Sequence, residues 1–142
     1  MPKIYRAMFA DGDLPMVGPD KNMLGVKIGD DEYDDIAADE EGRVVPGTGG
    51  MSVAPGWRVL PRHRIPKRLN TKLQKPIAKG SDRLHCWRYG SGDFESAGIT
   101  DHLRLVVDSS RHGTVEPSER MPAERYQRCL AATAPHWTVD EE

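Results

Sequence analysis

Four side chains that are far apart in the sequence have types that can act together on one ligand. Arg6 lies in an apolar N-terminal segment, where a charge costs stability unless it lines a cleft or has a partner. Ser52 follows a glycine-rich stretch, and His112 and Glu116 follow the apolar run LRLVV. In a strand, His112, Thr114 and Glu116 would point to the same face. The pattern indicates a polar face that an arginine and a serine from other strands complete.

These residue types suit the cleavage of a nicotinamide–ribose bond. The planar fork of an arginine can bind a diphosphate or a ribose. A serine hydroxyl can position the ribose. A carboxylate can accept a hydrogen bond from a ribose hydroxyl and stabilise the positive charge that develops as nicotinamide leaves. Arg6, Ser52, His112 and Glu116 therefore form a candidate catalytic group of the kind that a cleavage of NAD needs.

The stretch GTGGMS, residues 47–52, matches none of the common glycine motifs. No Gly-Lys-Ser/Thr follows it, as a P-loop requires, and the spacing of a dinucleotide fingerprint is absent. Ser52 is also not in a G-x-S-x-G elbow, because Val, Ala and Pro precede the next glycine. Two interpretations stay open: a tight loop in which Thr48 and Ser52 satisfy backbone groups, or a loop that places Ser52 beside an NAD cleft.

Three segments resemble a known family. IYRAMF, GRVVPGTGGMSV and SSRHGTVEPSERMPAERYQRCL are similar, in order and rough spacing, to segments of small type VI secretion effector toxins with an ADP-ribosyltransferase-like fold. The resemblance is vague between residues 69 and 108. It implies a bacterial, NAD-dependent toxin that acts in the cytoplasm of the producing or the target cell, after secretion in the latter case. It also implies a toxin–antitoxin arrangement with a cognate immunity protein as partner.

The resemblance also assigns residues. Carried over by position, it points to Arg6, Ser52, His112 and Thr114 as one group. It also points to cofactor-binding residues: Tyr5, Thr48, Gly49 and Gly50. His63 of the basic segment is added to this second set as a candidate contact to phosphate. Two positions depart from the family pattern. Met51 stands where the family carries a second hydroxyl, and Thr114 stands where ADP-ribosyltransferases place Glu or Gln two residues before the catalytic acid.

Length and composition predict one domain spanning residues 1–142. The net charge of −2 gives no global argument for nucleic acid or for a membrane. No apolar run is long enough to span a bilayer, and the N-terminus lacks the apolar core of a signal peptide. Cys86 and Cys129 are expected as free thiols of a reducing cytosol. The histidines lack zinc-site spacing, so no metal is expected.

Charge is distributed unevenly along the chain. Residues 30–41 read DDEYDDIAADEE, whereas residues 58–88 carry many Arg and Lys side chains and one acid, Asp82. One interpretation is two solvated faces that attract each other. The other is a basic cleft for a phosphate-bearing ligand, covered by the acidic segment.

Frequent Pro and Gly residues keep the predicted elements short. Strands are expected at the segments 3–9, 83–90, 102–108 and 111–118. Helices are expected at 30–42, ending at Gly42, at 66–76, and at 122–134, with Ser118 as the start of the last one. The prediction is an α+β, ADP-ribosyltransferase-like fold, in which mixed or antiparallel sheets form a central NAD cleft beside few short helices.

Three functional hypotheses remain from the sequence. The first is an NAD-consuming toxin that transfers ADP-ribose to a protein or nucleic acid, or that hydrolyses NAD. The second is an inactive binding domain of the same fold. The third is a nucleic-acid-binding module or RNase-type toxin that uses the basic segment 58–88 with His63 and His85. Each site residue also has a plain alternative: a paired Arg6, a turn-capping Ser52, an exposed His112 or a solvated Glu116.

Overall fold

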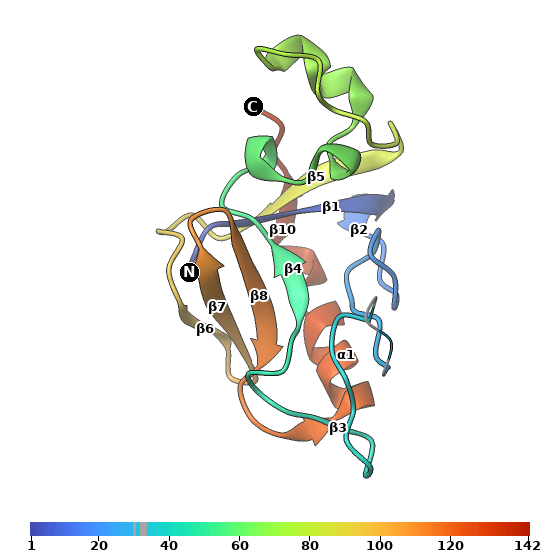
Figure 1. Cartoon of the computed structure of the whole chain (residues 1–142), viewed down its shortest axis with the longest axis vertical. Coiled ribbons are helices and arrows are strands. Elements are labelled where there is room, and N and C mark those ends of the chain that lie inside the picture. The colour runs from blue at the N-terminus through green and yellow to red at the C-terminus, as the bar shows by residue number, and fades with distance from the viewer. Residues whose placement is uncertain (30, 32–33) are drawn as a thin grey trace.

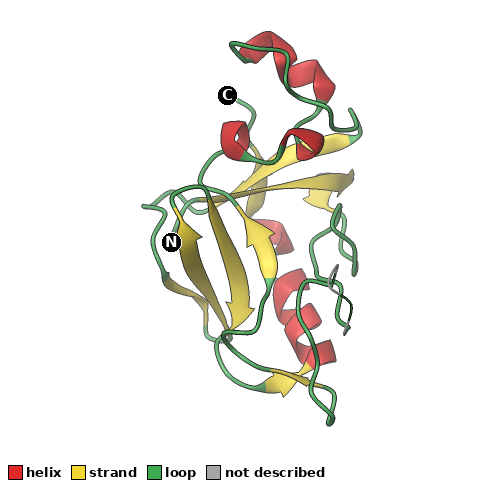
Figure 2. Ribbon diagram, in the orientation of Figure 1, coloured by secondary structure: helices red, strands yellow, loops and turns green. Residues whose placement is uncertain are grey.

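Short strands supply most of the regular structure in the computed structural model, which describes residues 1–29, 31 and 34–142. In this part of the chain the fold is α+β, with mostly antiparallel sheets and a single α-helix (Figures 1 and 2). None of the helices in the described residues has the length and apolar character needed to cross a bilayer.

The first sheet has the strand order β10-β5-β1-β2 and is antiparallel throughout. Its strands are Trp137–Val139 (β10), Leu84–Tyr89 (β5), Ile4–Asp11 (β1) and Leu14–Pro15 (β2). Alternation along β1 sends Ile4 and Met8 to one face and Tyr5 and Ala7 to the other. Both faces are buried, in two separate apolar clusters. The strand predicted at 83–90 is confirmed as β5, and its side chains alternate in the same way, since Cys86 and Trp87 lie in different clusters.

The second sheet has the order β4-β8-β7-β6. Its strands are Met51–Val53 (β4), His112–Pro117 (β8), Leu103–Ser109 (β7) and Ala97–Thr100 (β6). One face is apolar and packs into the main core through Met51, Val53, Leu103, Leu105 and Val115. The two sheets meet where Tyr5 and Ala54 exchange backbone hydrogen bonds of 2.8 and 3.0 Å. This junction brings Arg6 of β1 close to Ser52 of β4.

The C-terminal helix α1, Ala123–Ala131, packs behind the second sheet, beside a small pairing of Arg43–Val44 (β3) with Met121–Pro122 (β9) (Figure 1). Tyr126 and Leu130 are buried, as the apolar stripe predicts. Ser118 does not begin this helix. Its amide donates to the His102 carbonyl, and Pro122 precedes the first helical residue.

The predicted helix at 66–76 is a 3₁₀ segment, Lys67–Lys72 (η3). Both the amide group and the carbonyl oxygen of the Asn70 side chain bond to the Ala78 backbone, which folds the chain back. Further 3₁₀ turns are Trp57–Val59 (η1), Arg62–Arg64 (η2) and Ala134–His136 (η4). The segment from η1 to residue 80 forms a lobe that extends beyond β5 (Figure 1).

The acidic helix predicted at 30–42 is wrong for residues 34–42, while residues 30, 32 and 33 lie outside the described part. Ile36 is buried, and the amides of Asp35 and Ile36 donate to the Lys27 carbonyl. Asp39 accepts hydrogen bonds from the amides of Glu41 and Arg43 and closes a turn at Gly42, whose φ is +75°. Burial of one isoleucine and local carboxylate bonds outweigh the helix propensity of the segment.

The basic segment finds its acidic partners at residues 140–142. Arg68 pairs with Glu141 at 2.8 Å, and Arg88 pairs with Asp140 at 2.9 Å. Arg58 and Lys72 donate to the carbonyl groups of residues 142 and 141. The acidic stretch 34–41 pairs instead with Arg120 and Arg43. The described ion pairs therefore link the basic segment to residues 140 and 141, and the acidic stretch to Arg120 and to the adjacent Arg43.

We expect acid to loosen the 140–142 segment. Hydrogen bonds from Tyr5 and Arg88 lower the pKa of Asp140. Burial opposes ionisation of Glu141, but bonds from Arg68 and the Cys86 amide still lower its pKa. Both carboxylates stabilise the fold above their unfolded pKa, near 4, and this contribution is lost as the pH falls through their lower folded values. Urea unfolding at pH 7 and pH 3 measures the loss, about 1–2 kcal/mol. The double variant Asp140→Asn/Glu141→Gln should lack this component; an equal loss in the variant contradicts the assignment.

Candidate functional site

A cavity of about 320 Å³ lies where the two sheets meet. Four residues predicted from the sequence line it: Arg6, Ser52, His63 and His112. They come from β1, β4, η2 and the start of β8, so the fold brings together side chains up to about a hundred positions apart in the chain. Cavities of roughly 300–1,000 Å³ are typical of small-molecule sites.

Arg6 is buried, with 5% of the residue exposed. Its guanidinium donates to backbone carbonyls rather than to a carboxylate. Nη1 donates to Ser52 O at 2.8 Å, and Nε donates to Met23 O at 3.2 Å. Nη2 donates to the carbonyls of Lys21 and Gly25. Arg6 therefore fastens the segment 21–25 and β4 to β1, and it contributes a charged wall to the cavity. In the plain alternative Arg6 pairs with an acid, whereas its hydrogen bonds in the described residues go to carbonyl oxygens.

Ser52 and His112 project from the same face of the second sheet. Ser52 is directly opposite Thr114 in the β4–β8 register, and His112 lies two residues before Thr114 on the same face. Ser52 is exposed toward the cavity. His112 Nδ1 lies 2.9 Å from both carboxylate oxygens of Asp108. This contact places the Nδ1 proton on the Asp108 side and leaves Nε2 available to a ligand.

Glu116 lies on the same sheet face but does not line the cavity. It is 5% exposed, and its Oε1 accepts a hydrogen bond of 2.8 Å from the Gly47 amide. Its Oε2 accepts one of 2.9 Å from the Thr114 hydroxyl, and Arg104 lies 3.5 Å from Oε1. The carboxylate thus anchors the glycine loop to β8. The alternative of a solvated turn residue is wrong, because the side chain is buried and bonded.

Two predicted cofactor-binding residues have partners elsewhere. Tyr5 points to the opposite face of β1 from Arg6, and its hydroxyl donates to Asp140 at 2.7 Å. Burial and this bond raise the pKa of Tyr5 to about 12. Thr48 is exposed and donates to the Val45 carbonyl at 2.7 Å, as expected for a turn residue. Neither residue is among those that line the cavity.

Gly49 and Gly50 are required by close protein packing. A Cβ on Gly49, where φ is +134°, would lie 2.2 Å from the Asp35 carbonyl oxygen. A Cβ on Gly50 would lie 2.5 Å from Val115 O. The Gly50 amide also donates to Asp35 O at 3.1 Å. The glycine loop therefore joins the acidic segment to β8 and carries Ser52 into β4.

Replacing Gly49 should cost far more stability than replacing its neighbour in the loop. Gly49→Ala combines a disfavoured φ with a clash against backbone, and we expect a loss of about 2–4 kcal/mol. Gly47→Ala is the control, because φ is +83° there with open space around it. It should cost about 1–2 kcal/mol, the conformational part alone. Chemical denaturation of both variants tests the comparison, and equal losses contradict the packing argument.

The charged residues that line the cavity and were not identified as site residues from the sequence are Lys21, Asp35, Arg64 and Arg111. Arg64 donates to the Ala7 carbonyl at 2.7 Å and also bonds to Asn22 and to the Lys21 carbonyl. Arg111 is an exposed side chain in the turn before β8, adjacent to His112. Asp35 is the carboxylate among the lining residues, and its Oδ2 accepts from the Lys27 amide. The adjacency of Arg111 to His112 was a usable sequence signal.

The cavity is positively charged at neutral pH. Burial lowers the pKa of Arg6 to about 10 and lowers that of Arg64, yet both guanidinium groups stay protonated near pH 7. With Arg111 and Lys21, four cationic residues line the cavity beside one carboxylate, Asp35. The site therefore suits an anion that also carries a hydrogen-bond donor or a positive charge for the carboxylate.

Cys86 and Cys129 are free thiols. His63 and His85, the histidines of the RNase-type hypothesis, line different cavities. Comparison with models of known protein families and with curated protein sequences finds no match for this chain.

Proposed function

We propose that the protein is an NAD-consuming enzyme of the ADP-ribosyltransferase-like type, with its site in the cavity at the junction of the two sheets. The observation that carries this proposal is the convergence of Arg6, Ser52, His63 and His112, chosen from the sequence, on one positively charged cavity. The two sheets that flank the cavity agree with the NAD cleft expected from the resemblance.

The proposed roles follow from which groups are free to reach a ligand. Arg111 and His63 are exposed at the cavity and suit the diphosphate. The Ser52 hydroxyl and the His112 imidazole suit the nicotinamide ribose. Arg6 acts as a positioning residue, because its donors are taken by backbone carbonyls. Its charge still contributes to the field that attracts an anion.

The carboxylate role passes from Glu116 to Asp35 in this proposal. Glu116 is occupied in holding the glycine loop, whereas Asp35 lines the cavity. As the bond between the ribose C1′ and the nicotinamide nitrogen breaks, its electron pair leaves with nicotinamide and the ribose becomes positively charged. Asp35 stabilises this charge. Water or an acceptor nucleophile then attacks C1′, and His112, oriented by Asp108, takes the proton that the nucleophile loses.

The proposal is tested with the purified protein and NAD labelled in the nicotinamide ring. Release of labelled nicotinamide without other components identifies an NAD glycohydrolase, and release that requires a bacterial lysate, with ADP-ribose bound to a macromolecule, identifies a transferase. Absence of turnover under both conditions rules the enzyme out. The same fold with NAD binding but no turnover corresponds to an inactive binding domain.

The cellular role is proposed from the resemblance. We propose a toxin that acts in the cytoplasm and is neutralised by a co-encoded immunity protein. Expression of the chain in a bacterium should then arrest growth, and the gene next to it should relieve the arrest. RNA binding that weakens steeply with salt, without NAD turnover, would instead favour a nucleic-acid function for the basic lobe.

A further inference from the structure

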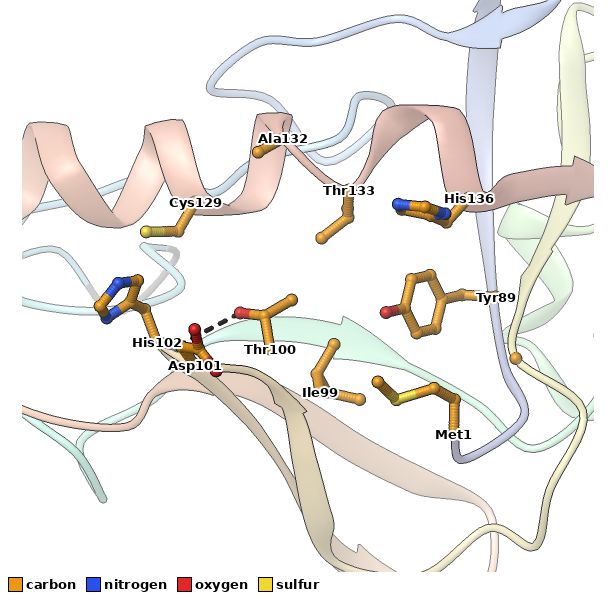
Figure 3. Close-up of a pocket in the computed structure, with 11 residues that line it drawn as sticks. Met1, Tyr89, Ile99, Thr100, Asp101, His102, Cys129, Ala132, Thr133 and His136 are labelled. Carbon is orange, nitrogen blue, oxygen red and sulfur yellow. Dashed lines mark hydrogen bonds between the residues drawn. The ribbon is translucent and has the colours of Figure 1, made fainter.

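A second cavity, of about 700 Å³, lies away from the candidate site. Its walls come from the turn after β6, from the end of α1 with η4, and from the end of β5 beside Met1 (Figure 3). None of the residues assigned above to NAD lines it. An inference from this cavity is therefore independent of the proposed NAD chemistry.

Tyr89 gives this cavity a hydrogen-bonding group without a protein partner. The residue is 5% exposed, and among the described residues its hydroxyl makes no hydrogen bond. Figure 3 shows the hydroxyl pointing into the space between Ile99, Thr100 and Thr133. Burial raises the pKa of this phenol, so it is neutral at physiological pH. Since no protein group bonds to this hydroxyl, a ligand in the cavity can bond to it in place of water.

The Tyr89 ring is held in place. The His136 ring meets it edge-on, with centroids 6.3 Å apart and planes at 86°. The Trp137 ring packs at 5.5 Å. A hydroxyl fixed in this way pays little ordering cost when a ligand binds to it.

Charge at the cavity disfavours anions. No lysine or arginine side chain is among its lining residues, whereas Asp101 contributes a carboxylate. Ala132 and Thr133 directly follow the last residue of α1, Ala131, where the helix dipole favours positive charge. His102 lies at this end too, 3.0 Å from the Glu119 carboxylate and 3.4 Å from the Arg125 guanidinium, so Asp101 is the charged side chain without such a balance there among the described residues. The surroundings thus suit a neutral or positively charged molecule.

The remaining walls are apolar and match a ring. Met1, Ile99, Cys129 and Ala132 supply aliphatic and sulfur surface opposite the rings of Tyr89 and His136 (Figure 3). The volume lies in the range of roughly 300–1,000 Å³ that small-molecule sites occupy. We infer that this cavity binds a small aromatic molecule, neutral or positively charged, whose polar group bonds to the Tyr89 hydroxyl.

The test titrates the full chain, ¹⁵N-labelled, with three matched probes and follows amide shifts by NMR. The probes are indole, which is neutral, tryptamine, which is cationic, and indole-3-acetate, which is anionic. We expect shifts at Ile99, Thr100 and Thr133 with indole and tryptamine at millimolar concentration or below, and binding of indole-3-acetate about tenfold weaker or more. Absence of shifts with all three probes overturns the site, and equal binding of the acetate overturns the charge preference.

Two variants locate the binding. Tyr89→Phe removes only the hydroxyl and should weaken tryptamine about threefold to tenfold, the worth of one hydrogen bond. Ala132→Phe fills the cavity from the exposed end of α1 and should abolish the shifts. A spectrum otherwise like that of the wild type verifies folding of each variant. Unchanged binding in Ala132→Phe places the probes elsewhere and overturns the inference, as does full affinity in Tyr89→Phe.

Discussion

Arg6→Met should destabilise the domain by about 3–5 kcal/mol, because it removes a buried cation whose donors satisfy four backbone carbonyls. The methionine keeps part of the apolar stem but cannot bond to Met23, Ser52 or Gly25. We expect the midpoint of thermal unfolding to fall by roughly 10–20 °C, measured by circular dichroism. The segment 21–25 should lose its protection from hydrogen exchange first, since Arg6 connects it to the sheets.

Arg111→Met is the matched control for this prediction. It removes the same type of side chain from the same cavity, but at an exposed turn position. Its stability should stay within about 0.5 kcal/mol of the wild type, while its KM for NAD rises if Arg111 binds the diphosphate. A stable Arg6→Met variant would contradict the positioning role and would indicate that Arg6 binds the ligand directly. Loss of activity in Arg6→Met alone therefore cannot identify a catalytic arginine.

The strands were predictable because their side-chain alternation reports burial directly. β5 follows this rule, with Cys86 and Trp87 on opposite buried faces. The acidic stretch was not predictable by composition, since a single buried side chain, Ile36, and the carboxylate of Asp39 decide its path. The composition of a twelve-residue stretch does not show that one of its side chains, here Ile36, is buried by a contact with distant residues.

The candidate site was predictable in part for a similar reason. Arg6, Ser52 and His112 stand on strands, where position along the chain determines the face, and they do line one cavity. Asp35 lies in an irregular segment whose path depends on the glycine loop, so its place in the site follows only from the packing at Gly49. Glu116 is on the predicted face, but its carboxylate accepts a hydrogen bond from the Gly47 amide and does not line the cavity. Local spacing determines the face of a side chain, and tertiary contacts determine its partner.

Asp35→Asn should lower the rate of nicotinamide release by about 10²–10³, the usual cost of removing one transition-state stabiliser. The amide has the same size and can still accept from the Lys27 amide, so folding should be kept. Because the charge matters only as the ribose becomes positive, kcat should fall while KM for NAD changes little. The measurement is a steady-state assay of labelled nicotinamide release.

Glu116→Gln is the comparison that decides between the two carboxylates. The amide loses the charge that strengthens the bonds from Gly47 and Thr114, so we expect a stability loss of about 1–2 kcal/mol. Its rate of nicotinamide release should fall by about tenfold or less, well below the loss for a group that faces the developing charge. The opposite order, with Glu116→Gln inactive and Asp35→Asn active, would show that the glycine loop moves to release Glu116 when NAD binds. The pair of variants therefore separates a carboxylate that stabilises the reacting ribose from one that holds the loop in place.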